Sequence, residues 1–246
     1  MDFTELDNLK EKLDSYRPLD KAVLENLHED LVLQWTYNSN AIEGNTLTLK
    51  ETKVALEGIT VGGKSLREHF EAVNHKEAIY YVEELVKENS PLTQFQIKSL
   101  HQLILKNIDE KNAGTYRTSN VTIAGAEHVP LDFTLVQQEM DTFIDWYNGP
   151  AQNMHPVERA ARVHCDFVKI HPFVDGNGRT SRLLMNLELM KCGFPATVLS
   201  VARRLEYYQA LDNAHTRKDY TDFIKLIAEI VKESFNPYWF ALGLEK

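Results

Sequence analysis

The sequence contains little cysteine and no long apolar run. Only Cys165 and Cys192 occur among 246 residues, which excludes a disulfide framework and favours a reducing, cytoplasmic setting. No apolar stretch approaches the ~20 residues that a transmembrane helix needs. The first residues, Met1–Glu5, are acidic and lack the apolar segment of a signal peptide. We therefore expect a cytoplasmic protein without a membrane-spanning segment.

Positive charge is also scarce. The chain has 27 Lys and Arg residues against 36 Asp and Glu residues, giving a net charge of -9. This balance argues against general binding to DNA or RNA, because such binding depends on clustered positive charge. A Gly-x-x-x-x-Gly-Lys phosphate-binding loop is absent from the sequence. Nucleic acid is therefore not an expected partner, and any phosphate site must be built in another way.

Helical periodicity dominates what is present. Apolar residues at three- and four-residue spacing predict a helix over residues 20–37, with an inner face formed by Val23, Leu24, Leu27, Leu31 and Trp35. We expect this helix to end near Ser39 and Asn40, because Gly44 follows shortly after. Three further helix starts are predicted by capping-box spelling, namely Thr48 with Glu51, Ser65 with Glu68, and Thr93 with Gln96.

One segment alone suggests β-structure. Asn120–Ala124 has the composition of a short strand, Gly125 and Ala126 can form a turn, and His128–Pro130 could be the returning strand. Because Pro130 lacks an N–H group, the pairing would be short and at an edge. The predicted fold is all-α, without internal repeats and with one short β-hairpin.

The stretch from His171 to Arg182 concentrates polar and flexible residues immediately before an apolar helical run. Gly176, Asn177 and Gly178 lie directly at the expected start of that helix. The glycines allow positive φ angles, so successive N–H groups can converge on one point, reinforced by the positive end of the helix. This pattern predicts an anion-binding cradle.

The charged residues of the same stretch indicate which anion. Arg179 and Arg182 share one face of the first helical turn, where the helix dipole disfavours cations, so a negative ligand such as a polyphosphate is expected. Asp175 beside a phosphate cradle is a natural Mg²⁺ ligand. His171 could accept a proton from an incoming hydroxyl group. The implied reaction is attack of a hydroxyl on a nucleotide phosphate.

Each of these residues also has an ordinary structural interpretation. A histidine before proline is often structural, a Gly-Asn-Gly sequence is often a turn, paired arginines often make surface ion pairs, and Asp175 could cap the helix. A zinc site formed by His164, Cys165, Asp166 and His171 is a further alternative, but no pair has a known zinc-ligand spacing. The combination at this spacing favours phosphate chemistry.

These twelve residues resemble the signature of Fic-domain proteins, His-Pro-Phe-x-Asp/Glu-Gly-Asn-Gly-Arg-x-x-Arg, and match it at every position. Fic proteins typically transfer AMP from ATP to a hydroxyl side chain (Ser, Thr or Tyr) of a target protein. The resemblance implies that His171 deprotonates the hydroxyl, Asp175 holds Mg²⁺ and Arg182 meets the γ-phosphate. The other phosphate ligands that it implies are Gly176, Asn177, Gly178 and Arg179.

The likeness extends beyond the signature. His155–Ala161 resembles the family's preceding helix, and Gly114–Pro130 resembles a flap thought to align an extended target segment by strand addition. The edge of this flap would be formed by Val121, Thr122 and Ile123. Tyr207 and Tyr208 resemble an aromatic pair near the nucleotide, although helix packing would equally account for them.

An additional motif lies far upstream. Ser39-Asn40-Ala41-Ile42-Glu43-Gly44 resembles the inhibitory motif of self-inhibited Fic proteins, Ser/Thr-x-x-x-Glu-Gly/Asn. The resemblance implies that Glu43 pairs with Arg182 and displaces the γ-phosphate, since a carboxylate and a phosphate compete for the same guanidinium. The ordinary alternative is an unremarkable carboxylate at a helix end.

The resemblance also predicts the organisation of the chain. Residues 1–89 would be an N-terminal helical region with the inhibitory helix at about 20–43, residues 90–215 the Fic core, and residues 216–246 C-terminal helices packed on that core in a single compact unit. The leading hypothesis is a self-inhibited protein adenylyltransferase, whose partners are ATP and a target protein. Alternatives are removal of AMP by the same site, transfer from other nucleotides, and a silent nucleotide-binding module. A homodimer is compatible with the resemblance.

Overall fold

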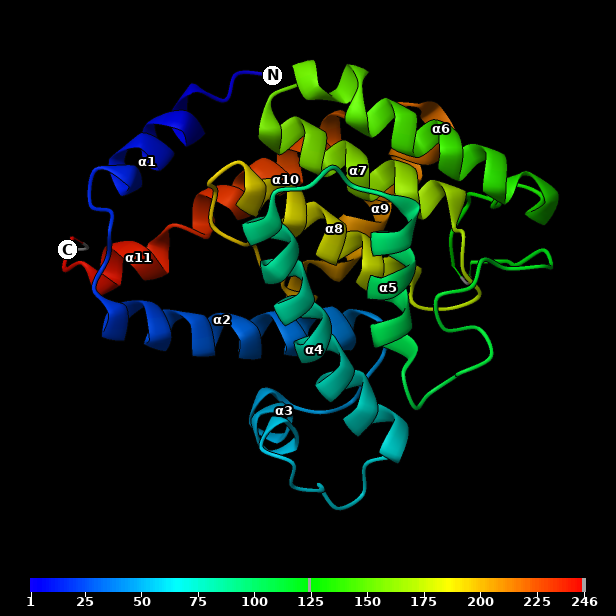
Figure 1. The fold of residues 1–246 in the computed structure, drawn as a ribbon, viewed down its shortest axis with the longest axis horizontal. Coiled ribbons are helices and arrows are strands. Elements are labelled where there is room, and N and C mark those ends of the chain that lie inside the picture. Colours follow the sequence, from blue (N-terminus) through cyan, green and yellow to red (C-terminus); the bar gives the residue numbers. More distant parts are fainter. Residues whose placement is uncertain (124, 245–246) are drawn as a thin grey trace.

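The computed structural model describes residues 1–123 and 125–244, and the secondary structure in this part of the chain is entirely helical (Figure 1). The α-helices are α1 (Thr4–Asp14), α2 (Lys21–Ile42), α3 (Leu49–Leu56), α4 (Leu66–Glu88), α5 (Gln94–Leu105), α6 (Val136–Asn148), α7 (Pro156–Ile170), α8 (Asn177–Lys191), α9 (Arg204–Arg217), α10 (Thr221–Glu233) and α11 (Asn236–Ala241). Short 3₁₀ helices are η1 (Phe133–Leu135), η2 (Pro150–Asn153) and η3 (Val201–Arg203). The predicted helical fold class is confirmed.

The helix starts follow the capping chemistry that the sequence predicts. Reciprocal capping boxes are present at Thr48, Ser65 and Thr93, where each hydroxyl accepts the N–H of the third helical residue. The helix predicted over residues 20–37 continues to Ile42, so that Glu43 lies directly at its C-terminal end. This longer course places Glu43 above the start of α8, as described below.

Helix α8 is the centre of the fold. Nearly all its residues are buried, including polar ones in its first two turns such as Arg179, Thr180, Ser181 and Arg182. A helix buried on all sides must be surrounded by other elements, and α7, α4, α5 and α2 all contact it (Figure 1). The N-terminal end of α8 therefore lies among side chains from several helices.

Two hydrophobic clusters fill the interior. One joins α1, α9, α10 and α11 to α7 and α8, and includes Phe3, Tyr207 and Phe223. The other joins α2, α4, α5, α6, α7 and α8, and includes Trp35 and Phe173. Both clusters draw residues from distant parts of the chain. Within residues 1–123 and 125–244, no helix combines the length and hydrophobicity needed to cross a membrane.

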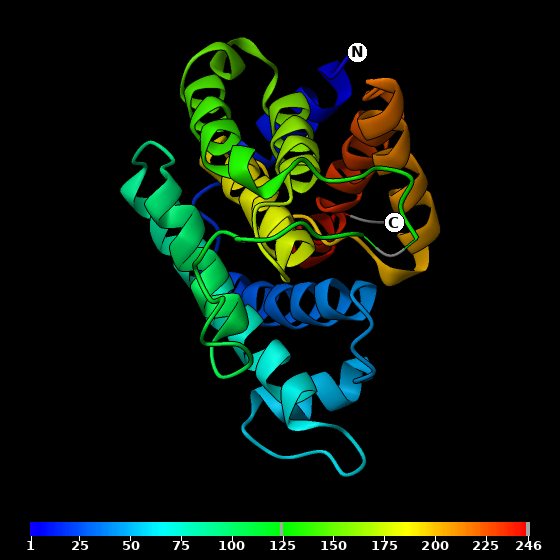
Figure 2. The ribbon, with the colours of Figure 1, turned by 90° about the vertical axis from the view of Figure 1, so that its right-hand side faces the viewer.

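The predicted β-hairpin was wrong in detail. The segments around Val121 and Val129 are extended and run side by side (Figure 2), but no strand forms in their described residues; Ala124 lies outside them. The two arms are held by the buried side chain of Arg117 instead, which donates hydrogen bonds to the carbonyl groups of Ser119 (3.0 Å) and Leu131 (2.6 Å). A side-chain clamp thus replaces the backbone ladder.

Candidate active site

The loop between α7 and α8 is built by its own backbone and by Asn177. His171 ends α7 in the left-handed conformation (φ 51°), and its N–H still donates to the carbonyl of Phe167. The side chain of Asn177 accepts the N–H of Phe173 (3.0 Å) and donates to its carbonyl (2.9 Å). Asn177 therefore fixes the shape of the loop, because both ends of its amide are committed to Phe173.

His101 on α5 packs against the loop between α7 and α8, although the sequence did not indicate this role. Its Nε2 donates to the carbonyl of Asp175 (2.8 Å), and its Nδ1 accepts the N–H of Gly114 (3.0 Å). The ring also stacks on Phe173 at a centroid distance of 3.5 Å. A Cβ atom at Gly176 (φ 78°) would lie 3.2 Å from this ring, so only glycine fits the turn comfortably.

Arg117 connects the loop to the flap, and it too was missed from the sequence. Its backbone N–H donates to the carbonyl of Pro172 (2.9 Å), and its Nε donates to the carbonyl of His171 (2.8 Å). Together with its hydrogen bonds to the two flap arms, these contacts hold flap and loop as one unit. A buried arginine that binds only carbonyl groups has no recognisable spacing in the sequence.

His171 is mostly buried beside this unit. Burial is the main cause that lowers the pKa of His171 to about 4. The imidazole is consequently neutral at pH 7, which is the form that can accept a proton from a hydroxyl group. This protonation state matches the role that the sequence predicts for His171.

Glu43 reaches Arg182 across the start of α8. Arg182 is almost fully buried, and its Nη2 lies 2.7 Å from Oε1 of Glu43. Ser39 binds the same guanidinium twice, because its hydroxyl accepts from Nε (3.0 Å) and its carbonyl accepts from Nη2 (2.8 Å). The Glu43–Arg182 contact is therefore a single one, and Ser39 supplies two further acceptors for the guanidinium.

Electrostatics at Arg182 depend on this carboxylate. Burial alone would lower the pKa of Arg182, but the charge of Glu43 and the hydroxyl of Tyr207 outweigh it and raise the pKa above its usual value. Gly178 makes the approach of Glu43 sterically feasible, because a Cβ atom there would collide with Oε1 of Glu43. The site thus places a carboxylate where a helix N-terminus and a buried arginine both attract an anion.

Tyr207 and Tyr208 make different contacts near the start of α8. The buried Tyr207 hydroxyl lies 3.4 Å from Nη1 of Arg182 and 3.2 Å from Nε2 of His164. The hydroxyl of Tyr208 donates to the carbonyl of Ile42 at the end of α2 (3.2 Å). Tyr207 thus links α9 to α7 and α8, and Tyr208 links α9 to the end of α2.

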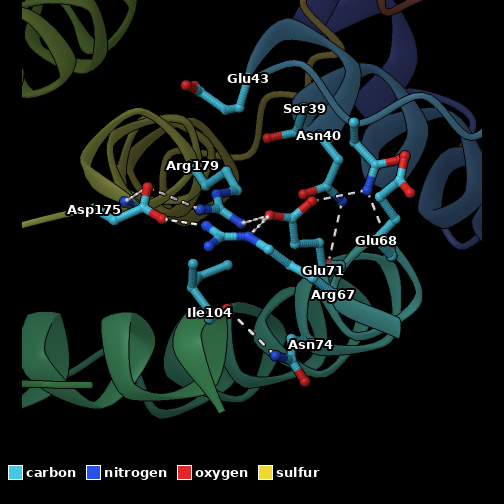
Figure 3. Close-up of polar contacts among 12 residues, drawn as sticks. Ser39, Asn40, Glu43, Arg67, Glu68, Glu71, Asn74, Ile104, Asp175 and Arg179 are labelled. Atoms are coloured by element: carbon cyan, nitrogen blue, oxygen red, sulfur yellow. Dashed lines mark hydrogen bonds and ion pairs between the residues drawn. The ribbon is translucent and has the colours of Figure 1, made fainter. Parts of the chain in front are cut away.

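Asp175 lies in the loop before α8, beside Arg179, at the left of Figure 3. Its Oδ1 accepts from the N–H of Gly176 (2.6 Å) and lies 3.2 Å from Nη2 of Arg179. Burial alone would raise the pKa of Asp175, but Arg179, the Gly176 amide and Arg67 outweigh it and lower the pKa below its usual value. An ionised, half-exposed carboxylate beside a helix N-terminus suits a hard divalent cation that arrives with a phosphate ligand.

The other residues that the sequence suggested make fewer contacts with the loop before α8. His164 is buried against Ser181 (Oγ to Nε2, 3.0 Å), and no cluster of three or more His, Cys, Asp or Glu side chains that could enclose a metal occurs in the described part of the chain. Val121, Thr122 and Ile123 make no hydrogen bond to the loop among the described residues. Arg179, in contrast, has a buried Nε without a partner there, a donor that an anion could satisfy.

The helical fold thus places the anion-attracting N-terminus of α8 next to a neutral histidine. Comparison with known proteins gives the family. The model of the Fic/DOC family matches residues 91–189. A solved structure of Fic-1 from Caenorhabditis elegans superposes with a TM-score of 0.90 and 32% identity, over 98% of this chain and 72% of that one. The chain belongs to the Fic/DOC family.

Other relatives agree. The protein adenylyltransferase Fic of Nematostella vectensis is 36% identical over 238 residues, which is 95% of this chain and 55% of the relative. A Fic-domain-containing signaling protein from Bacteroides thetaiotaomicron has a TM-score of 0.90 at 29% identity, over 98% of both chains. The chain spans about half the length of the curated relatives it matches.

Proposed function

We propose that the chain is a protein adenylyltransferase, which transfers AMP from ATP to a hydroxyl side chain of a protein, and that Glu43 inhibits it. The observation that carries the proposal is the contact of Glu43 with Arg182 at the start of α8, inside a complete family signature. Curated relatives that match most of this chain are named protein adenylyltransferase Fic, which supports the activity.

The geometry allows a role for each residue. The N-terminal amides of α8 and the guanidinium of Arg179 would bind the phosphates. Neutral His171 would accept the proton of the target hydroxyl as its oxygen bonds to the α-phosphorus and the bond to the pyrophosphate breaks. Asp175 would hold Mg²⁺, which when bound offsets phosphate charge. Arg182 would bind the γ-phosphate once Glu43 has moved away.

Inhibition follows from competition for one binding position. The carboxylate of Glu43 lies at the α8 terminus and holds a donor of Arg182. A γ-phosphate at the same position would meet a like charge within contact distance, which is strongly unfavourable in a partly buried site. ATP would then bind weakly or with its α-phosphate misplaced for attack.

The target is expected to be an extended protein segment. The flap arms run alongside the loop that carries His171 and are joined to it through Arg117. Because the arms are extended without forming a ladder in their described residues, their backbone groups suit the addition of a strand from a partner. Val121, Thr122 and Ile123 would form this edge.

Transfer of radiolabelled AMP tests the proposal. Glu43→Gly protein incubated with labelled ATP and Mg²⁺ should label protein in a lysate, or itself, at a much higher rate than wild type. Glu43→Gly combined with His171→Ala should label nothing while still binding ATP. If Glu43→Gly protein binds ATP but transfers no label to any protein, the proposed activity is wrong.

A specific feature of Glu43 favours a second candidate, the hydrolytic removal of AMP from a modified protein. Its side chain is 34% exposed and contacts Arg182 through Oε1, so Oε2 could orient a water molecule. Incubation of wild-type protein with an AMP-modified substrate, made with Glu43→Gly protein, would show loss of one AMP by mass. An unchanged mass would eliminate this candidate.

A further inference from the structure

Helix α4 contributes two charged side chains to the signature loop that the signature itself does not contain. Nη2 of Arg67 lies 2.6 Å from Oδ2 of Asp175, and its Nε donates to Oε1 of Glu71 at 3.1 Å. Glu71 in turn lies 3.5 Å from Nη1 of Arg179, whose Nη2 returns to Asp175. Figure 3 shows the result, a closed ring of four alternating charges across α4 and the start of α8.

Within this ring, the two oxygens of Asp175 have different partners. Oδ1 is held by the Gly176 amide and by Arg179, both parts of the signature. Oδ2 has Arg67 as its only hydrogen-bond partner among the described residues. A divalent cation that bound Oδ2 would stand close to the guanidinium of Arg67. A cation on Oδ2 and the Arg67 guanidinium on the same oxygen would repel each other, which weakens the binding of both.

Burial shows which member of the ring can move. The side chain of Arg179 is 3% exposed and that of Glu71 12%, whereas that of Arg67 is 57% exposed. Arg67 can therefore swing into solvent, and it can keep its contact with Glu71 as it leaves Asp175. Glu71 is itself fixed by Asn45, whose amide donates to its Oε2 (2.9 Å).

We propose that Arg67 is a built-in substitute for the divalent cation at Asp175. It occupies the cation position while the site is empty, and the cation that accompanies a nucleotide has to displace it. The identity of the ligand as a cation–nucleotide complex rests on the proposed function. The Arg67–Asp175 contact is separate from the Glu43–Arg182 contact. Arg67 on α4 therefore raises the cation concentration needed for binding, independently of Glu43 at the end of α2.

Direct measurement of Mn²⁺ binding tests this role without any turnover. All variants carry Glu43→Gly, so that a non-hydrolysable ATP analogue can bind, and free Mn²⁺ is followed by its electron paramagnetic resonance signal. Arg67→Gln should lower the dissociation constant for Mn²⁺ about fivefold at low salt, the upper range for a partly exposed ion pair. The difference should shrink as ionic strength rises.

Lys87→Gln is the matched control, because it removes the same charge from the exposed C-terminal end of α4. Its Mn²⁺ affinity should equal that of the parent. Unchanged or weaker Mn²⁺ binding by Arg67→Gln would overturn the proposal, since Arg67 would then be neutral or would position Asp175 for the cation. Failure of every variant to bind Mn²⁺ would overturn it as well.

The test also separates this inference from the adenylyltransferase proposal. AMP transfer by the Glu43→Gly parent is measured on the same preparations by mass. Tighter Mn²⁺ binding by Arg67→Gln without any AMP transfer would leave the role of Arg67 standing and contradict the proposed activity.

Discussion

At the scale of single residues, the site depends on close approaches that only small or neutral side chains permit. Gly178 is the clearest case, because its missing side chain is the space that Oε1 of Glu43 occupies. Charge matters in the same way at His171. Burial lowers the pKa of His171, so the ring stays neutral and is not repelled by the nearby charge of Arg117. Individual residues thus determine both the space and the charge at the N-terminus of α8.

The close approach at Gly178 predicts a coupled effect on stability. Gly178→Ala should destabilise the wild-type protein by about 1 kcal/mol, the scale of one lost hydrogen bond, because the new Cβ atom pushes Oε1 of Glu43 away from Arg182. In a Glu43→Gly background most of this cost should disappear, since the colliding atom is gone. Urea unfolding of the four proteins of this cycle measures the coupling. Equal costs in both backgrounds would show that Glu43 does not occupy this position in solution.

At the scale of elements, the first two turns of α8 break the rule that cations avoid a helix N-terminus. Arg179 and Arg182 are compensated by carboxylates from three different places: Asp175 in the loop, Glu71 on α4 and Glu43 at the end of α2. The sequence predicted that an anion must be present there. Carboxylates of the chain itself fill that role, and under the proposed function a phosphate ligand would have to compete with them.

This competition has a consequence for Glu43→Gly. Loss of the carboxylate leaves buried Arg182 with Ser39 and Tyr207 as partners, so the free energy of unfolding should fall by about 2 kcal/mol. Inorganic triphosphate should raise the melting temperature of Glu43→Gly more than that of wild type, because the anion replaces the lost charge. Differential scanning fluorimetry with and without triphosphate measures both shifts. A larger shift in wild type would contradict competition at Arg182.

Prediction from the sequence succeeded for features encoded by neighbouring residues. Helix periodicity and capping boxes located α2, α3, α4 and α5, and the signature located the loop before α8. Prediction failed where a feature of the site depends on residues that are far apart in the sequence. His101 lies on a buried helix face and is indistinguishable from a core histidine in the sequence, whereas Arg67 has the pattern of an ordinary surface charge. The hairpin prediction was wrong because the two arms are joined by the side chain of Arg117, which lies outside the strand pattern, and not, in their described residues, by a ladder of backbone hydrogen bonds.

At the scale of the whole molecule, the fold keeps an unusual number of histidines neutral. Burial is the main cause that lowers the pKa of His75 and His164 well below the usual value of 6.5, and that of His101, His171 and His215 to about 4. These five residues come from α4, α5, α7 with the loop that follows it, and α9. Protonation of any of them would require charge inside the packed structure.

The buried histidines predict sensitivity to mild acid. A lowered folded-state pKa means that the unfolded chain binds more protons below pH 6.5, so stability is fully present above that pH and is lost as the pH falls toward about 4. Each such histidine contributes roughly 1.4 kcal/mol per pH unit in this window, so the free energy of unfolding should fall by at least about 2 kcal/mol between pH 6.5 and about pH 5. Urea titrations across this range measure it. Constant stability would contradict the neutral histidines.

The central claim is that Glu43 and the γ-phosphate of ATP compete for Arg182, and that this competition controls AMP transfer. Intact-mass analysis of Glu43→Gly protein after incubation with ATP and Mg²⁺ tests it most directly, with wild-type protein treated in parallel. A mass gain of one AMP in Glu43→Gly protein, and none in wild type, is the predicted result. Equal modification of both proteins, or no modification of Glu43→Gly or of any protein offered to it despite bound ATP, would contradict the claim.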